Sequence, residues 1–320
     1  MAPAETRVSR AFVAVLAATF GDKLRKNEPL SGHTTLRLGG PADVWLPVTS
    51  LTELVAAVNL ARQHQTAVFV LGGGANLLIS DAGIRGLVIE NRANQVHFPP
   101  EAGAGTTGKL VVESGVVLPN LARRCAKRGL SGLEWAGGVP GTVGGAVVNN
   151  AGAYGSDMTT SLVRVELLAP AGDRVWQPLS WLRYGYRTSR LKERNGSGGT
   201  DWIVLQAELR MSLAPVSEIE ARMHAFNERR KSSQPPGATI GSMFKNPKGD
   251  YAGRLIEAAG LKGYQVGRAQ ISSIHANFFQ NLGGATSSDV LALIEAAQAA
   301  VEEKYGVRLE LEIEVVGEPG

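Results

Sequence analysis

Hydrophobic positions along the chain follow two spacings, one typical of helices and one typical of strands. Leu51, Leu54 and Val58 fall on one helical face, and Ser50 with Glu53 has the form of a capping box that starts this helix. Short apolar runs bounded by glycines and polar residues have the length of buried strands. The pattern predicts helices over residues 51–64 and 118–129, and strands over residues 68–71, 87–90, 109–113, 162–168 and 202–211.

Both ends of the chain show helical periodicity. Residues 1–30 have the spacing of one leading helix that ends near Pro29. Ser217 and Glu220 follow Pro215 as a second capping box, which predicts a new helix start. The pattern then predicts helices over residues 217–230, 251–259 (followed by Gly260) and 287–304, and a last strand over residues 308–316 with Leu309, Leu311, Ile313 and Val315 on one face.

The order of these elements predicts the fold class. Strands outnumber helices between residues 35 and 211 and do not alternate regularly with them, which favours an α+β fold over a series of βαβ units. A domain boundary is expected near residues 211–216. The predicted organisation is a helix and lead-in over residues 1–34, one domain over 35–211 and another over 212–320, with a surface loop at 195–200.

The composition is that of an ordinary globular protein with a mild positive charge. Hydrophobic residues make up 44% of the 320 residues, charged residues 19%, and the net charge is +4. The basic residues form no stripe with interleaved aromatic residues, so nucleic-acid binding is not expected. No apolar run approaches the ~20 residues of a membrane span. The apolar stretch at residues 11–20 lacks a signal-peptide cleavage site, so we expect a cytoplasmic protein without a membrane partner.

Several common functional motifs are absent. The single cysteine, Cys125, cannot form an intrachain disulfide, and its place on the helical face of Leu118 and Leu121 predicts a buried structural thiol rather than a nucleophile. The five histidines are scattered, so no metal site is predicted. There is no Walker A lysine motif and no Gly-x-Ser-x-Gly turn.

Two glycine-rich runs, expected to be loops, are the most informative segments for function. Residues 137–155 contain seven glycines and no charged residue, and a second run begins at Gly72 after the strand predicted over residues 68–71. Bare backbone amides can surround phosphate oxygens without a formal charge. Two runs suggest a long ligand with a central phosphate, such as a dinucleotide, although Leu77 stands where a Rossmann fingerprint needs its third glycine. Tight connections in a glycine-rich β protein are the alternative.

Three polar residues are candidates for chemistry, and each also has an ordinary structural explanation. Ser242 follows Gly241 in an apolar turn, where a hydroxyl can give a proton in a dry site or bond the local backbone. Arg187 can clamp a carboxylate or pack on Tyr186 at the surface. Glu312 lies on the polar face of the predicted last strand, where a glutamate is ordinarily solvated.

Taken in order, several motifs of the chain resemble those of the UDP-N-acetylenolpyruvoylglucosamine reductase family, flavoenzymes of peptidoglycan precursor synthesis. The resemblance runs from about residue 27 to residue 317. Each motif alone is weak, whereas their order and spacing are highly specific. They are residues 34–40 (TTLRLGG), 71–78 (LGGGANLL), 140–145 (PGTVGG), 149–155 (NNAGAYG), 186–189 (YRTS), 241–247 (GSMFKNP) and 309–312 (LELE).

The resemblance implies a fold, cofactors and partners. It implies an FAD-binding region of the vanillyl-alcohol-oxidase type, made of two α+β subdomains, followed by an α+β substrate-binding domain. It also implies that NADPH reduces the flavin at the site that the enolpyruvyl sugar later occupies, which fits the missing Rossmann fingerprint. The partners would be two small molecules, NADPH and UDP-N-acetylglucosamine enolpyruvate, and a monomer is expected.

The resemblance also implies roles for individual residues. Ser242 corresponds to the proton donor to C2 of the enolpyruvyl group, while flavin N5 delivers hydride to C3. Arg187 and Glu312 correspond to groups that stabilise the enol form of the substrate carboxylate. The implied cofactor-binding positions are Arg37, Gly72, Gly73, Gly74, Asn76, Leu77, Val139, Pro140, Gly141, Gly144, Gly145, Asn149, Ala151, Gly152, Tyr154 and Gly155. The implied substrate-binding positions are Tyr186, Lys231, Lys245 and Asn246.

One departure from the family pattern concerns the substrate diphosphate. Many members have lysine just before the Gln-Pro pair at residues 234–235, where this chain has Ser233. Lys231 and Lys245 are the expected substitutes. Only residues 188–203 separate Arg187 from Val204, which leaves no room for the inserted tyrosine loop of one family class. The resemblance is therefore to the shorter class.

Two other functions stay open from the sequence. One is an FAD-dependent sugar or alcohol oxidase on the same flavin fold. Such enzymes often tether the flavin through histidine or cysteine, and neither glycine run contains a histidine. The other is a flavin- or UDP-sugar-binding protein without turnover, which would bind FAD but would not be bleached by NADPH.

Overall fold

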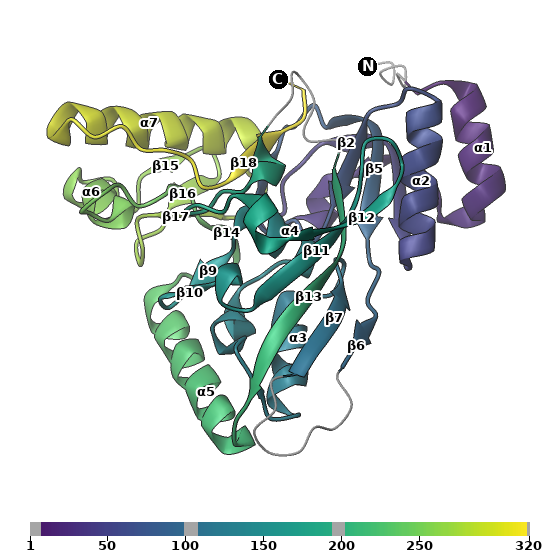
Figure 1. Ribbon diagram of the computed structural model, residues 1–320. Helices are drawn as coiled ribbons and strands as arrows, with labels where there is room; N and C mark the ends of the chain where they lie inside the picture. The colour runs from purple at the N-terminus through teal and green to yellow at the C-terminus, as the bar shows by residue number, and fades with distance from the viewer. Residues whose placement is uncertain (1–7, 99–107, 194–201, 319–320) are drawn as a thin grey trace.

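Three main sheets organise the chain, each with its own helices (Figure 1). The computed structural model describes residues 8–98, 108–193 and 202–318. The surface loop predicted at residues 195–200 lies outside these ranges. We refer to the parts built on the three sheets as the first, second and third regions, in chain order.

The first region is a four-stranded sheet with two helices packed on it. Its order is β1 (Arg25–Pro29), β2 (Pro41–Val48), β5 (Ile84–Asn91) and β3 (Val68–Leu71), and β1 alone is antiparallel to its neighbour. Helices α1 (Arg10–Phe20) and α2 (Leu51–Gln63) lie side by side (Figure 1) and share a buried core with the sheet. The hydroxyl of Ser50 accepts a hydrogen bond from the backbone N–H of Glu53, which confirms the predicted helix start.

The single helix predicted over residues 1–30 is wrong. α1 ends at Phe20, because Gly21 leaves the helical conformation with φ +61°, and a 3-10 helix at Gly21–Lys23 leads into β1. β1 pairs with β2 from Arg25 to Pro29. Its residues are polar and mostly exposed, so no alternation of hydrophobic positions marked it as a strand.

The second region is an antiparallel sheet that contains three of the predicted strands. α3 (Leu118–Ala126), α4 (Val143–Asn149) and α5 (Val216–Ser233) share its hydrophobic core. The strands predicted over residues 109–113, 162–168 and 202–211 are confirmed to within two residues. The sheet order is β12 (Arg174–Pro178), β11 (Leu162–Leu168), β13 (Ile203–Leu213), β7 (Gly108–Glu113) and β6 (Val96–His97), with β8 (Leu130–Ser131) also paired to β13.

Helix α5 begins without the predicted capping box. Its N-cap is Pro215, which makes no side-chain hydrogen bond, and Ser217 already lies inside the helix. Ile219 and Met223 of α5 are buried in the core of the second region. This packing places α5 with the second region, and the boundary near residues 211–216 stays a prediction.

The third region is a four-stranded antiparallel sheet that the hydrophobic pattern did not reveal. Its strands have only two to five residues, which is too short to show alternation. Leu36, Leu38 and Leu78 reach its core from the first region. The order is β14 (Ala238–Ser242), β17 (Phe278–Asn281), β16 (Ala269–Ile271) and β15 (Gln265–Val266), packed with α6 (Ala252–Ala258) and α7 (Ser287–Tyr305), both of which were predicted.

The strand predicted over residues 308–316 is wrong for most of its length. Only β18 (Glu314–Val316) is a strand, and it pairs in parallel with β4 (Leu77–Ile79). Leu309 and Ile313 are buried, but Val315 is 38% exposed, so the predicted common face does not exist. Residues 310–312 instead bond the segment after β14 through an isolated bridge between Phe244 and Leu311. The segment therefore joins the third region to the first.

Short elements complete the described part of the chain. They are β9 (Gly152–Ala153), paired with β10 (Ser156–Asp157), and 3-10 helices at Leu30–His33, Glu134–Gly138, Met158–Thr160, Leu179–Leu182 and Arg190–Lys192. Within the described ranges, every helix is too short or too polar to cross a membrane. Cys125 is buried, which raises the pKa of its thiol to about 12 and confirms the structural thiol.

Candidate active site

The two glycine-rich runs lie against each other, although the sequence separates them. A Cβ atom added at Gly72 would lie 2.5 Å from the hydroxyl oxygen of Thr142, and one at Gly73 would lie 2.9 Å from Cα of Gly141. Such distances leave no room for a side chain. The runs therefore form a continuous surface of bare backbone where the first and second regions meet.

The glycine content of the second run suggested a loop, but part of the run is a helix. Residues 143–149 form α4, and the hydroxyl of Thr142 accepts a hydrogen bond from the backbone N–H of Gly145 at the helix start. Gly144 packs on Ser114, since an added Cβ would lie 2.9 Å from the Ser114 Cβ. The run thus contains glycines required by packing as well as glycines at the contact between the runs.

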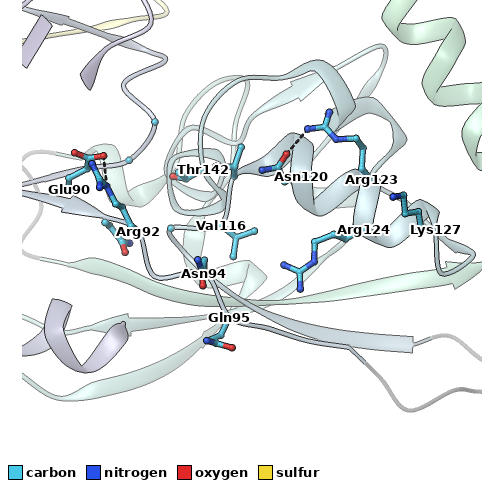
Figure 2. A pocket seen from close by; sticks show the side chains of 15 residues that line it. Glu90, Arg92, Asn94, Gln95, Val116, Asn120, Arg123, Arg124, Lys127 and Thr142 are labelled. Atoms are coloured by element: carbon cyan, nitrogen blue, oxygen red, sulfur yellow. Dashed lines mark hydrogen bonds and ion pairs between the residues drawn. The ribbon is translucent and has the colours of Figure 1, made fainter. Parts of the chain in front are cut away.

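A cleft of about 930 Å³ opens beside this contact (Figure 2). One wall is α3, and the other is the segment that follows β5, as Figure 2 shows. The lining combines backbone from both glycine runs with amide and cationic side chains. It consists of Gly72, Gly73, Glu90, Asn91, Arg92, Asn94, Gln95, Gly115, Val116, Val117, Asn120, Arg123, Arg124, Lys127 and Thr142.

The α3 wall carries positive charge that no carboxylate of the described residues neutralises. Arg123 donates to the side-chain oxygen of Asn120 at 2.5 Å, and the guanidinium of Arg124 lies 5.2 Å from the ring centroid of Phe98. Lys127 lines the same wall. Cations beside bare backbone amides suit phosphate oxygens, so the cleft fits the diphosphate part of a dinucleotide such as FAD. These α3 residues were missed because a basic helix end has an ordinary electrostatic explanation.

Gly72 and Gly73 line the cleft, and the other predicted cofactor positions lie outside its lining. Gly74, at φ +57°, accepts a hydrogen bond at its carbonyl from the backbone N–H of Thr35 (3.0 Å). Arg37, at φ +55°, lies two residues after Thr35. Leu77 begins β4, Gly152 and Ala153 form β9, and Val139, Pro140, Ala151, Tyr154 and Gly155 flank α4 and the β9–β10 pair.

Three distant parts of the chain meet at Arg187. Its Nε donates to Oε1 of Glu312 at 2.8 Å, its Nη2 to the carbonyl of Gly152 at 2.5 Å, and its Nη1 to the carbonyl of Asn150 at 3.4 Å. Its backbone is left-handed, with φ +56°. These contacts fix the guanidinium against the end of the second glycine run and use three of its five N–H groups.

Backbone pairing brings Ser242 next to Glu312. The backbone N–H of Glu312 donates to the carbonyl of Met243 at 2.9 Å, and Met243 directly follows Ser242. Asn277, which is buried, accepts a hydrogen bond from the Phe244 N–H and donates to the Phe244 carbonyl. This clamp holds the chain just past Ser242. No pattern in the sequence marked Asn277, because a buried asparagine cannot be distinguished from a surface one by its spacing.

Burial sets the protonation behaviour of Glu312. Its side chain is only 18% exposed, and the loss of water raises the pKa of the carboxyl above its ordinary value despite opposing attraction from Arg187, Lys192 and Lys245. A raised pKa favours the protonated carboxyl, which can donate a hydrogen bond. The alternative explanation, a solvated glutamate on the polar face of a strand, therefore does not apply to Glu312.

A hydrogen-bonded group of amides and a lysine links this site to the first glycine run. The Asn76 amide donates to the Glu312 carbonyl (3.2 Å) and to the side-chain oxygen of Asn149 (3.3 Å). The ammonium of Lys192 donates to the same Asn149 oxygen at 2.9 Å and pairs with Glu314 at 3.4 Å. Asn76 and Asn149, predicted as cofactor positions, are thus brought together, and Lys192 is an addition that the motifs did not contain.

The predicted substrate positions lie at the margins of this arrangement. Tyr186 is 54% exposed beside Arg187. Lys245 pairs with Glu310 at 3.3 Å, and Lys231, exposed at the end of α5, pairs with Glu228 at 2.8 Å. Asn246 accepts a hydrogen bond at its side-chain oxygen from the N–H of Ala252 and so supports the start of α6. Within the described ranges, no group of three or more histidine, cysteine, aspartate or glutamate side chains could hold a metal ion.

Comparison with known proteins decides the family. An FAD binding domain model matches residues 42–177, and a UDP-N-acetylenolpyruvoylglucosamine reductase C-terminal domain model matches residues 233–316. The chain is 44% identical to the UDP-N-acetylenolpyruvoylglucosamine reductase of Chloroflexus aggregans, over 92% of this chain and 97% of that protein. It is 45% identical to that of Rubrobacter xylanophilus, over 92% and 95%. This chain belongs to the UDP-N-acetylenolpyruvoylglucosamine reductase family.

A solved structure of this reductase family supports the same conclusion. The crystal structure of UDP-N-acetylenolpyruvylglucosamine reductase from Thermus caldophilus matches with a TM-score of 0.75 and 37% identity, over 91% of this chain and 99% of that one. The resemblance seen in the motifs and the α+β fold with an FAD-binding domain are thereby confirmed. The FAD binding domain match spans the first and second regions, whose contact borders the cleft.

Proposed function

We propose that the protein is an FAD enzyme that uses NADPH to reduce UDP-N-acetylglucosamine enolpyruvate to UDP-N-acetylmuramate. Membership of the reductase family supports the overall reaction and the use of FAD. The assignment of reacting groups is supported by the hydrogen bond from Arg187 to Glu312 and by the backbone pairing of Glu312 with Met243, the residue that follows Ser242. Each comes from a different part of the chain, and each matches a role that the motifs implied.

The cofactor and the protein divide the chemistry. Reduced FAD, when bound, supplies a hydride for C3 of the enolpyruvyl group, and Gly72, Gly73 and the cations of α3 would hold its phosphates. Adding hydride to a carbon–carbon double bond requires that the negative charge spreading onto the substrate carboxylate be stabilised, which preorganised donors do best. Arg187 offers its two remaining N–H groups, and Glu312, whose pKa burial raises, would offer a hydroxyl when its carboxyl carries a proton.

Ser242 completes the reaction by supplying a proton to C2. It stands at the end of β14, held by the Asn277 clamp on the following residues. Its neighbour Met243 is bonded to Glu312, so the proton donor and the carboxylate-stabilising groups lie at one junction. Tyr186 and the other predicted substrate positions would contact the sugar nucleotide around this junction.

Anaerobic visible spectroscopy tests the proposal. NADPH is added to the purified protein loaded with FAD, and UDP-N-acetylglucosamine enolpyruvate follows. We expect NADPH to bleach the flavin band and the enolpyruvyl sugar to restore it. Protein that binds FAD but responds to neither reagent would contradict the reaction, and flavin that stays with the protein after acid precipitation would indicate a covalently tethered oxidase.

We also propose that the protein works as a cytoplasmic monomer with an FAD-binding domain over residues 35–211 and a substrate-binding domain over residues 212–320. The third region has a core built mainly from its own residues, which supports a separate C-terminal domain, while α5 packs on the core of the second region. Light scattering after size exclusion, at micromolar protein, checks the oligomeric state.

A further inference from the structure

The expected substitutes for the missing lysine are already engaged. The hydroxyl of Ser233 donates to the carbonyl of Arg229 at 2.7 Å. Lys231 is 74% exposed in its side chain and pairs with Glu228, while Lys245 pairs with Glu310. Arg230, also at the end of α5, has no such carboxylate partner among the described residues.

Arg230 points back from α5 toward the second glycine run. A Cβ added at Gly138 would lie 3.0 Å from Cδ and 3.7 Å from Nε of Arg230, so the arginine side chain lies directly against this glycine. Arg230 also interacts with the side chain of Tyr154. It makes no ion pair with a carboxylate of the described residues, and burial lowers the pKa of its guanidinium.

Packing holds Arg230 in this place. The ring of Tyr154 stacks on Phe226 with centroids 4.4 Å apart, and its hydroxyl donates to the Phe226 carbonyl at 3.0 Å. Tyr154 lies two residues beyond Gly152, whose carbonyl accepts from Arg187. Arg230 therefore contacts both ends of the second glycine run, with Gly138 near its start and Tyr154 near its end. Gly152, at the same end of the run as Tyr154, contacts Arg187.

We propose that Arg230 binds a diphosphate group. The inference rests on the proposed function, because the reaction brings two diphosphates to the protein, one in FAD and one in the sugar nucleotide. A guanidinium can hold two phosphate oxygens through parallel hydrogen bonds. Without a carboxylate partner, its charge is available to an anionic ligand.

Separate titrations of UDP and FAD test this role and distinguish the two sources. We compare Arg230→Gln with Arg229→Gln, which removes the same charge from the neighbouring exposed position, and with Lys231→Gln. Loss of a charged hydrogen bond should weaken binding about 10- to 100-fold. A higher Kd for UDP alone assigns the sugar nucleotide, and a higher Kd for FAD alone assigns the cofactor; Arg229→Gln should change neither by more than about threefold.

Two outcomes would overturn the proposal. One is unchanged Kd values for both ligands in Arg230→Gln, and the other is a larger loss in Lys231→Gln. Arg230→Lys, which keeps the charge, should restore part of the lost affinity, whereas a purely structural role would instead lower the melting temperature without a selective loss of one ligand. Because UDP binding is measured directly, failure of the wild-type protein to reduce the enolpyruvyl sugar would count against the proposed function alone.

Discussion

The cofactor cleft and the Arg187 junction are built by opposite means. At the cleft, Gly72 and Gly73 approach the second run so closely that a side chain would not fit. At the junction, Arg187, Glu312 and Asn76 are held by side-chain hydrogen bonds between segments far apart in the chain. The cleft requires glycines, which have no side chain, whereas the junction requires the particular side chains of Arg187, Glu312 and Asn76.

This contrast predicts how the cleft and the junction respond to substitutions and to pH. The backbone amides at the contact between the glycine runs do not change protonation in the physiological range, so added side-chain volume should damage this part of the cleft most. The junction depends on the protonation of Glu312, which burial and neighbouring cations set together. The junction should therefore be sensitive to charge and pH, and the cleft to volume.

The largest expected effect is on the proton donor of the junction. Ser242→Ala should slow reduction of the enolpyruvyl sugar about 10²- to 10⁴-fold, because the variant has no hydroxyl to protonate C2. Reduction of the flavin by NADPH should stay nearly unchanged, and stopped-flow absorbance separates the two half-reactions. Ser212→Ala, at an exposed position of β13, is the control; equal loss in both half-reactions of Ser242→Ala would remove the proton-donor role.

A second change tests the geometry of the junction while keeping its charge. Arg187→Lys should lower kcat/KM for the enolpyruvyl sugar about 10²- to 10³-fold, since one ammonium cannot reproduce the contacts with Glu312, Gly152 and Asn150. Steady-state kinetics measures the effect. Arg210→Lys, on the exposed side of β13, should change little, and near wild-type kinetics for Arg187→Lys would show that charge alone suffices.

A small steric change tests the cleft. Gly73→Ala should weaken FAD binding about tenfold or more, because the new methyl group would lie 2.9 Å from Cα of Gly141, and overpacking of this kind costs about 1–3 kcal/mol. Equilibrium dialysis with FAD gives the Kd. Gly32→Ala is the matched control, since its added Cβ meets nothing within 4 Å. Equal affinities in the two variants would break the steric account of the cleft.

The smallest expected effect concerns stability and pH. Because the folded protein raises the pKa of Glu312, it binds the proton more tightly than the unfolded chain does. This contribution to the free energy of unfolding is present at low pH and is lost as pH rises from about 4.5 through the folded pKa. Glu312→Gln should thus gain stability relative to wild type across that window in urea titrations, while Glu310→Gln, at a 75% exposed side chain, should show no such trend.

The sequence was sufficient to predict the helices and strands whose hydrophobic positions repeat regularly. Leu54 and Val58 marked α2, and strand β11 was predicted at its observed bounds. The glycine runs predicted a phosphate-binding surface, and the ordered motifs indicated the family. In these segments one local pattern dominates, so the local signal matches the final structure.

The rest depends on contacts that no local pattern contains. The sheet of the third region has strands such as Gln265–Val266, which exist only through their pairing. The alternation around Glu312 suggested a solvated side chain, but pairing with the segment after Ser242 buries it. The cationic wall of the cleft could not be predicted either, because Arg123 and Lys127 come into position only when α3 packs across from the chain leaving β5.

The pairing of β4 with β18 has a consequence for how the molecule is made. On the ribosome, Leu77–Ile79 emerges early, but its parallel partner Glu314–Val316 is synthesised only after the second region and most of the third. Leu36 and Leu38 likewise wait for a core that the third region supplies later. The first region is therefore left with an unpaired strand and exposed leucines during synthesis, a state in which early folding intermediates bind chaperones or aggregate. Translation speed and chaperone supply should therefore affect the yield of this protein.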